Sequence, residues 1–127
     1  HHTFDVDHEG KDSYRHRIAG AREVLLASRN RFALMHEMRA DDEPTLNELL
    51  GKLAPVDLVL IEGYKRDGHS KIEAFRAQTN NPLIATGDLT IRAVASNTPM
   101  PLDRPVFDLD DTVAVADFIL SEVGLIK

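Results

Sequence analysis

One run of the sequence, residues 56–63, constrains the fold more than any other. It reads Val-Asp-Leu-Val-Leu-Ile-Glu-Gly and is apolar at most positions rather than at every second one. A strand with this pattern is buried on both faces, as in a parallel sheet that is covered by helices. The run therefore predicts an α/β protein with a central parallel strand that ends at Gly63.

Short apolar runs separated by turn residues predict the other strands. The runs at 24–27 and 31–35 flank a polar Ser-Arg-Asn junction, which is typical of a hairpin. Further strands are predicted at residues 71–76, 82–86, 91–95 and 105–109. Strands that alternate with helices indicate an α/β fold whose sheet is mostly parallel, with some antiparallel edge strands.

Capping residues and apolar spacings of three and four predict the helices. The first covers residues 12–21, with Asp12 as its cap. The second begins after Thr45, which forms a capping box with Glu48, and ends before Pro55.

The last helix begins at Asp111 or Thr112 and ends at Gly124, a residue type that stops helices. The chain contains neither a long linker nor an internal repeat. We therefore expect residues 1–127 to form a single domain, a length that is sufficient for one hydrophobic core.

The composition argues against several classes of protein. The chain has no cysteine, which excludes a thiolate nucleophile and any Cys-ligated metal within it. A net charge of −6 and an aromatic content of 6% argue against a nucleic-acid partner. No apolar run approaches the roughly 20 residues that cross a bilayer. We therefore expect a cytoplasmic protein without a membrane partner.

An acidic motif lies near the start of the chain. Asp5 and Asp7 are two residues apart, so both would project from one face of an extended strand. Paired carboxylates beside phosphates suit Mg²⁺, and we predict Asp7 as a metal ligand. Zinc is the alternative, in a metal-dependent hydrolase built on His1, His2, Asp5, Asp7 and His8, although the terminal histidines also resemble a purification tag.

A basic segment follows this motif at residues 10–17. A glycine precedes a predicted helix whose first turns carry several cations, and such a helix start favours anions. The alternative is a capped surface helix with solvated arginines. The predicted anion-binding residues are Lys11, Ser13, Arg15, His16 and Arg17.

Glu62 would stand at the carboxyl end of the central strand, directly before Gly63. Open α/β sheets bind ligands at this end of their strands, which favours a metal-associated role for Glu62. Lys65 and Lys71 would flank the same edge, and we predict that they and Gly63 contact the ligand.

Asp88 would lie just after the carboxyl end of the predicted strand at 82–86, as Glu62 lies at the end of the central strand. Its carboxylate could accept two N–H bonds from a guanine edge, and an Asx turn is the alternative. The 127 residues contain no G-x-x-x-x-G-K-[ST] phosphate loop.

Two motifs resemble the MobB family of molybdopterin-guanine dinucleotide biosynthesis adaptors. The first covers residues 2–17 and continues into Ala-Gly-Ala at 19–21; the second covers residues 57–65 and 71–73. The resemblance implies a three-layer P-loop-NTPase-like protein that binds GTP and Mg²⁺ and forms a homodimer. It also implies a partner, the guanylyltransferase that attaches GMP to molybdopterin, and a possible contact with molybdopterin itself.

Members of this family begin with a strand, a phosphate loop and a helix, so we expect this chain to start after that first βα unit. The resemblance implies that Asp7 and Glu62 lie near Mg²⁺ and that the basic segment faces phosphates. No residue is evident that would orient a hydrolytic water, and we expect a slow GTPase at most. The alternatives are a nucleotide-free dimeric interaction domain and the metal-dependent hydrolase.

Overall fold

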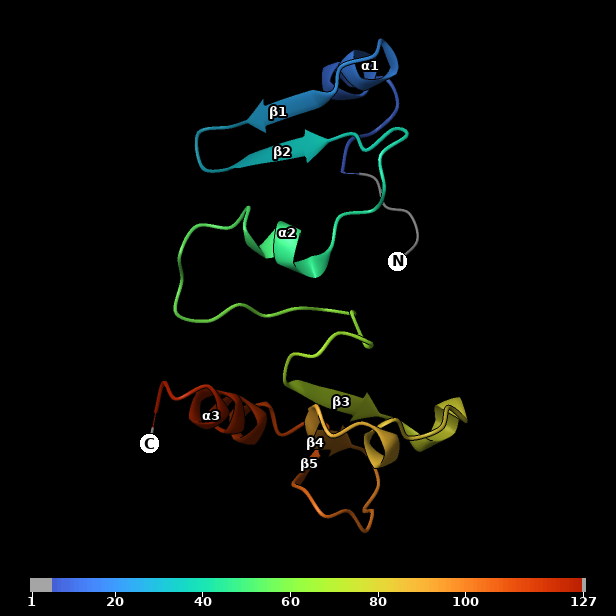
Figure 1. The fold of residues 1–127 in the computed structure, drawn as a ribbon, viewed down its shortest axis with the longest axis vertical. Helices are drawn as coiled ribbons and strands as arrows, with labels where there is room; N and C mark the ends of the chain where they lie inside the picture. The colour runs from blue at the N-terminus through green and yellow to red at the C-terminus, as the bar shows by residue number, and fades with distance from the viewer. Residues whose placement is uncertain (1–5, 127) are drawn as a thin grey trace. The chain divides into compact units, whose positions relative to one another are not determined.

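The computed structural model describes residues 6–126 of the chain. These residues belong to two compact units, 1–49 and 50–127, each of which is described by itself. Figure 1 labels the helices and strands of both units. The prediction that they act as one domain stays a prediction.

The first unit is a hairpin with a short helix. β1 (Glu23–Ala27) and β2 (Phe32–His36) pair antiparallel and place Leu25 opposite Leu34. The predicted hairpin is confirmed. In its turn the hydroxyl of Ser28 accepts the amide of Arg31 at 3.3 Å.

The helix α1 (Asp12–Ile18) precedes β1 and is shorter than predicted. The prediction that Asp12 caps it is wrong, because Lys11 is the N-cap residue and Asp12 already lies in the first turn. The helix ends early because Gly20, two residues after Ile18, has a φ of +108°.

α2 (Leu46–Leu50) begins with the predicted capping box. The amide of Thr45 donates to Glu48 Oε2 at 2.8 Å, and the amide of Glu48 donates to Thr45 Oγ1 at 3.2 Å. The helix ends well before Pro55. Leu53, which lies between the end of the helix and Pro55, is 55% exposed and adds little packing that would extend the helix.

The second unit contains a parallel sheet in the order β3-β4-β5. These strands cover Lys71–Phe75, Ile91–Ser96 and Val106–Asp108. They confirm the strands predicted at 71–76, 91–95 and 105–109. The buried core lies around the central strand β4, where Ile91 and Val94 pack with Ala85.

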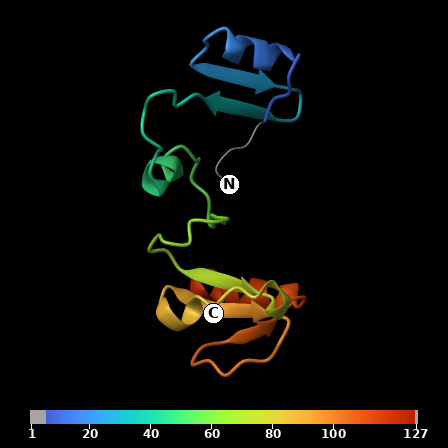
Figure 2. The ribbon, with the colours of Figure 1, turned by 90° about the vertical axis from the view of Figure 1, so that its right-hand side faces the viewer.

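α3 (Thr112–Glu122) covers one face of this sheet, as Figure 2 shows. Its Phe118 ring lies 5.4 Å from the ring of Phe107 on β5. The predicted start at Asp111 or Thr112 is confirmed: Asp111 is the cap, and its Oδ1 accepts the amide of Ala114 at 3.0 Å. None of the described helices is long and apolar enough to cross a membrane.

The strand predicted at residues 56–63 does not form. This segment has no regular secondary structure, and none of its described amide and carbonyl groups makes a backbone hydrogen bond. A strand needs a neighbour to complete its ladder, and apolar composition alone cannot supply one.

The strand predicted at 82–86 is also wrong. Its place is taken by the 3-10 helix η2 (Ala85–Gly87), which follows another 3-10 helix, η1 (Ala77–Thr79). The carboxylate of Glu73 accepts the amides of Ile84 at 2.9 Å and Ala85 at 2.8 Å. These amides are therefore bound by a side chain and not by a neighbouring strand.

The predicted α/β class with a mostly parallel sheet is confirmed. The antiparallel strands were expected at the edge of the parallel sheet. Instead, β1 and β2 form a two-stranded sheet of their own.

Candidate functional site

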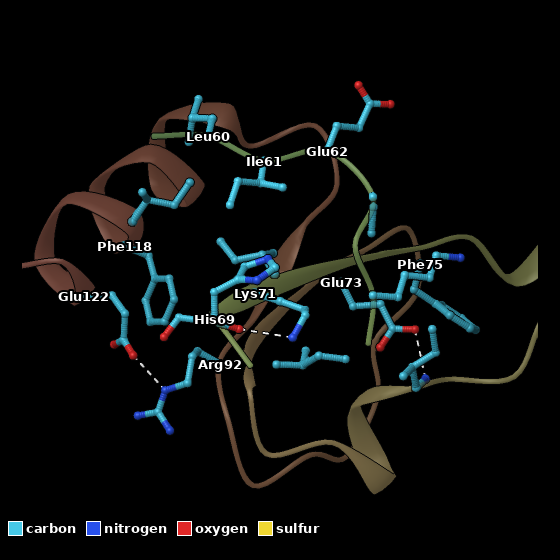
Figure 3. Close-up of a pocket in the computed structure, with 18 of the residues that line it drawn as sticks. Leu60, Ile61, Glu62, His69, Lys71, Glu73, Phe75, Arg92, Phe118 and Glu122 are labelled. Carbon is cyan, nitrogen blue, oxygen red and sulfur yellow. Dashed lines mark hydrogen bonds and ion pairs between the residues drawn. The ribbon is translucent and has the colours of Figure 1, made fainter. Parts of the chain in front are cut away.

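Glu62, the predicted metal ligand of the second unit, borders a cavity of about 830 Å³. Residues 58–63 form one wall of this cavity, and β3 and α3 form others. Figure 3 shows Ile61 directed toward β3, whereas the carboxylate of Glu62 points away from the cavity. Glu62 is exposed and is therefore accessible to a ligand.

A tight turn follows Glu62. Gly63 has a φ of +83° and Tyr64 a φ of +51°, and the amide of Asp67 donates to the carbonyl of Tyr64 at 3.2 Å. Glycine tolerates a positive φ, whereas a bulky residue such as tyrosine adopts it rarely. The turn carries Lys65 at its exposed surface.

Lys71 lies at the amino end of β3, where its ammonium is bound within the unit. It donates to the carbonyl of Asp67, to the carbonyl of His69 at 3.1 Å and to Thr90 Oγ1 at 2.7 Å. An ammonium has three N–H donors, so these acceptors use all of them. Lys71 would have to give up one of these bonds to bind a phosphate.

Asp88 precedes β4 and therefore lies at the amino end of that strand. Its Oδ1 accepts the amide of Thr90 at 2.9 Å and the hydroxyl of Thr90 at 2.6 Å. These hydrogen bonds are the largest cause that lowers the pKa of the Asp88 carboxyl, with smaller contributions from the positive charges of Lys71 and Arg104. The geometry corresponds to the Asx-turn alternative.

Thr90 thus brings two predicted ligand-binding residues together, since its hydroxyl bonds both Lys71 and Asp88. Both lie at the amino ends of parallel strands. Ligands of open α/β sheets bind outside the carboxyl ends, where the segment that ends at Glu62 was expected to contribute.

The basic segment lies on and beside α1. Lys11, Arg15 and His16 are exposed, whereas Ser13 is buried. The Arg15 side chain is 75% exposed and lies 4.0 Å from the Asp12 carboxylate. Three predicted anion-binding residues are therefore accessible at the surface of the first unit.

Arg17 differs from these exposed cations. Its Nη2 lies 3.3 Å from Asp7 Oδ1, and the Asp7 side chain is only 3% exposed. Its Nε lies 3.9 Å from the Glu37 carboxylate, and the guanidinium stacks 5.0 Å from the centroid of the Tyr14 ring. Arg17, which was predicted to bind phosphate, therefore forms an ion pair with Asp7, which was predicted to bind the metal ion.

The two predicted metal ligands belong to different units of the chain. Asp7 belongs to the first unit and Glu62 to the second. Within residues 6–126, no group of three or more His, Asp or Glu side chains could hold a metal ion. His1, His2 and Asp5, which the hydrolase alternative needs, lie outside the described residues.

Sequence reasoning missed the role of Glu73, whose two carboxylate oxygens organise the start of η2. A charged residue in the middle of an alternating strand was the available signal. The carboxylate oxygens of Glu73, however, accept amides that are eleven and twelve residues away in the chain. No local sequence pattern reveals such distant partners.

The described residues form an α/β protein with a parallel sheet, an exposed glutamate after an apolar segment and a helix rich in cations. Comparison with known proteins gives the family. The family model described as MobB, molybdopterin guanine dinucleotide synthesis protein B, matches residues 1–97. The chain belongs to this family.

Two relatives are molybdopterin-guanine dinucleotide biosynthesis adapter proteins. The one from Escherichia coli K12 is 39% identical over 94% of this chain, and the one from Haemophilus influenzae is 37% identical over 94%. The chain spans 70% and 66% of their respective lengths.

The structure is also similar to a crystal structure of a MobB protein homologue from Bacillus stearothermophilus. The TM-score is 0.67 at 29% identity, over 84% of this chain and 74% of that one. This similarity agrees with a P-loop-like fold.

Proposed function

We propose that this chain acts as a GTP-binding adapter in molybdopterin guanine dinucleotide biosynthesis, where it assists the guanylyltransferase. The observation that carries the proposal is the 39% identity, over 94% of the chain, to an adapter protein of that pathway. The family model matches residues 1–97 and therefore covers both motifs that contain most of the predicted site residues.

The exposed charges support a role toward a nucleoside triphosphate. Glu62 is free of described ion pairs and fits a ligand of Mg²⁺, an ion that proteins hold through one or two carboxylates beside phosphates. Asp7 would bind a metal ion only after leaving Arg17. The exposed Lys11, Arg15 and His16 provide positive charge for phosphate oxygens.

An adapter role fits these residues better than rapid turnover. Phosphoryl transfer to water needs a group that orients the attacking water, and the sequence shows no evident residue for this task. We therefore propose that the protein holds GTP for its partner and hydrolyses it slowly at most.

Isothermal titration calorimetry of the full-length protein with GTP tests the proposal. We expect binding that requires MgCl₂ and is lost in excess EDTA, with ATP as the control nucleotide. Equal heats for GTP and ATP, or none for GTP at millimolar concentration, would contradict it.

A second feature favours the dimeric state. On one face of the hairpin Leu25 is 62% exposed, Leu34 opposite it is 58% exposed, and Phe32 is 74% exposed. Contiguous exposed apolar side chains mark protein interfaces, and both strands of a two-stranded sheet also have an open edge. We propose that this surface, the hairpin face, joins two copies of the chain.

A further inference from the structure

We propose that Lys71 is a positioning residue, which holds the turn after Glu62 and so fixes the direction in which the Glu62 carboxylate meets Mg²⁺. Lys71 acts through the backbone of residues 64–69 and does not touch the nucleotide. The inference rests on the proposed function, because it concerns the proposed metal ligand. All the residues involved belong to the second unit.

The turn after Glu62 depends on an anchor outside itself. Before it, none of the described groups of residues 58–63 makes a backbone hydrogen bond. Within it, the amide of Asp67 donates to the carbonyl of Tyr64 at 3.2 Å. Tyr64 has a φ of +51°, and a bulky residue keeps such a conformation only where the surrounding structure holds it.

The ammonium of Lys71 provides this anchor. It donates to the carbonyl of Asp67 and, at 3.1 Å, to the carbonyl of His69. The dashed line at Lys71 in Figure 3 marks the bond to His69. Asp67 therefore bonds Tyr64 through its amide and Lys71 through its carbonyl, which connects the turn to the start of β3.

An irregularity in the sheet lies where Lys71 leaves β3. Lys71 pairs with Ile91 and Ile72 pairs with Ala93, so the register shifts between these two residues of β3. A bulge changes the direction of the side chains beside it, and bulges are frequent next to functional sites. The register shift therefore accompanies a lysine that is directed at the turn.

Thr90 and Asp88 fix the direction of the ammonium. The hydroxyl oxygen of Thr90 lies 2.7 Å from Lys71 Nζ and 2.6 Å from Asp88 Oδ1. An ammonium only donates and an ionised carboxylate only accepts, so the hydroxyl must donate to Asp88 and accept from Lys71. Asp88, which the sequence suggested for guanine, thus orients the hydroxyl that binds Lys71.

Arg104 ties this group to the core of the unit. Its Nη1 donates to the carbonyl of Asp88 at 3.0 Å and to the carbonyl of Ile91 at 2.7 Å. The Arg104 side chain is only 12% exposed, and Ile91 belongs to the buried cluster around β4. The anchor of the turn is therefore built on the sheet, where positions are held more precisely than on loops.

Direct contact between Lys71 and a phosphate is the competing role. Such a contact would displace one of the three acceptors that already use the N–H groups of the ammonium. Thr90→Val separates the two roles, because it removes one acceptor and keeps the positive charge of Lys71. Lys71→Met removes the charge and all three bonds.

Hydrogen exchange of the full-length protein, followed by NMR without nucleotide, tests the anchor. We expect the amide of Asp67 to exchange about tenfold faster in Thr90→Val and in Lys71→Met than in the wild type. Thr86→Val, whose hydroxyl bonds the carbonyl of Leu83, is the matched control and should leave this rate unchanged. An unchanged rate at Val94 in the central strand verifies that each variant is folded.

Calorimetry with GTP tests the effect on the metal ligand. We expect Thr90→Val to raise the Kd for GTP in MgCl₂ about tenfold, the loss that is typical when a group supporting a metal ligand is removed. Residual binding in EDTA should stay unchanged, because no phosphate contact is lost. A variant that is merely less stable would lose affinity equally under both conditions.

Two results would overturn the proposal. One is an Asp67 amide that exchanges at the wild-type rate in both Thr90→Val and Lys71→Met. The other is a loss of GTP affinity in Lys71→Met that is equal in MgCl₂ and EDTA, with Thr90→Val unaffected, because Lys71 would then bind phosphate. A wild-type protein without Mg²⁺-dependent binding would contradict the proposed function instead, and the exchange rates would still decide whether Lys71 holds the turn.

Discussion

The guanidinium of Arg17 lies 3.3 Å from the carboxylate of Asp7, and that carboxylate is 3% exposed. The pair connects the segment before α1 to the helix itself. Glu37, which follows β2, lies 3.9 Å from the same guanidinium and extends the connection to the hairpin. Two residues that sequence reasoning placed around a ligand therefore hold the first unit together.

We predict that Arg17→Met strongly destabilises the first unit. The variant leaves the buried Asp7 carboxylate without its cation, and removal of one partner of a buried pair costs about 3 kcal/mol or more. Urea unfolding followed by Tyr14 fluorescence, in a Tyr64→Phe background, measures this unit alone.

Arg15→Met is the matched control for this change. The Arg15 side chain is 75% exposed, and its 4.0 Å pair with Asp12 lies at the surface. Such pairs contribute about 0–1 kcal/mol, so the two variants should differ clearly. Equal urea midpoints would refute the structural role of the Arg17–Asp7 pair.

Glu62→Gln tests the proposed metal ligand. The amide keeps the size of the side chain but removes the charge that Mg²⁺ requires. We expect the ratio of GTP affinities in MgCl₂ and in EDTA to fall at least about tenfold, the loss observed even for residues that only support metal ligands. Calorimetry of the full-length protein gives this ratio, and the exposed Glu43→Gln should leave it unchanged.

The Asp88 carboxylate should make the free energy of unfolding of the second unit depend on pH. Its pKa is lowered in the folded state, so its contribution is fully present above the unfolded pKa and is lost as pH falls through the folded value. Thr90→Val removes the hydroxyl donor and should raise the carboxyl pKa, as measured by NMR titration. Thr86→Val, whose hydroxyl bonds Leu83, is the control, and an unchanged Asp88 pKa in Thr90→Val would contradict the assigned cause.

Asp111→Ala should destabilise the second unit by about 1 kcal/mol, because it removes the side-chain cap of α3. Thermal or urea unfolding measures the change. The neighbouring Asp110→Ala alters the same net charge without touching the cap, so a similar loss in both variants would show that the cap is not responsible.

Phe32→Ser tests the hairpin face as the dimer contact. Phe32 is 74% exposed, so its replacement should not damage the fold, but it removes a large apolar side chain from the proposed interface. Light scattering should show the dimer of the wild-type chain shifted to monomer. Leu53→Ser, at a leucine that is 55% exposed outside the hairpin, should leave the mass unchanged.

The sequence predicted most of the elements that are held by interactions between residues close together in the chain. The capping box of Thr45 and Glu48 and the cap at Asp111 each join residues that are three apart in the chain. Helix lengths were less predictable: α2 ends at Leu50, and Leu53 beyond it is 55% exposed.

The sequence by itself determined the α/β class, the hairpin and the residue types around each cap, since these depend on neighbours along the chain. Only the tertiary structure decided that residues 58–63 lack a partner strand, that Glu73 binds the amides before η2, and that Arg17 pairs with Asp7. Each of these outcomes depends on a group that is distant in sequence. Apolar burial and charge pairing are satisfied by whichever group the fold brings near, and a one-dimensional pattern does not specify that group.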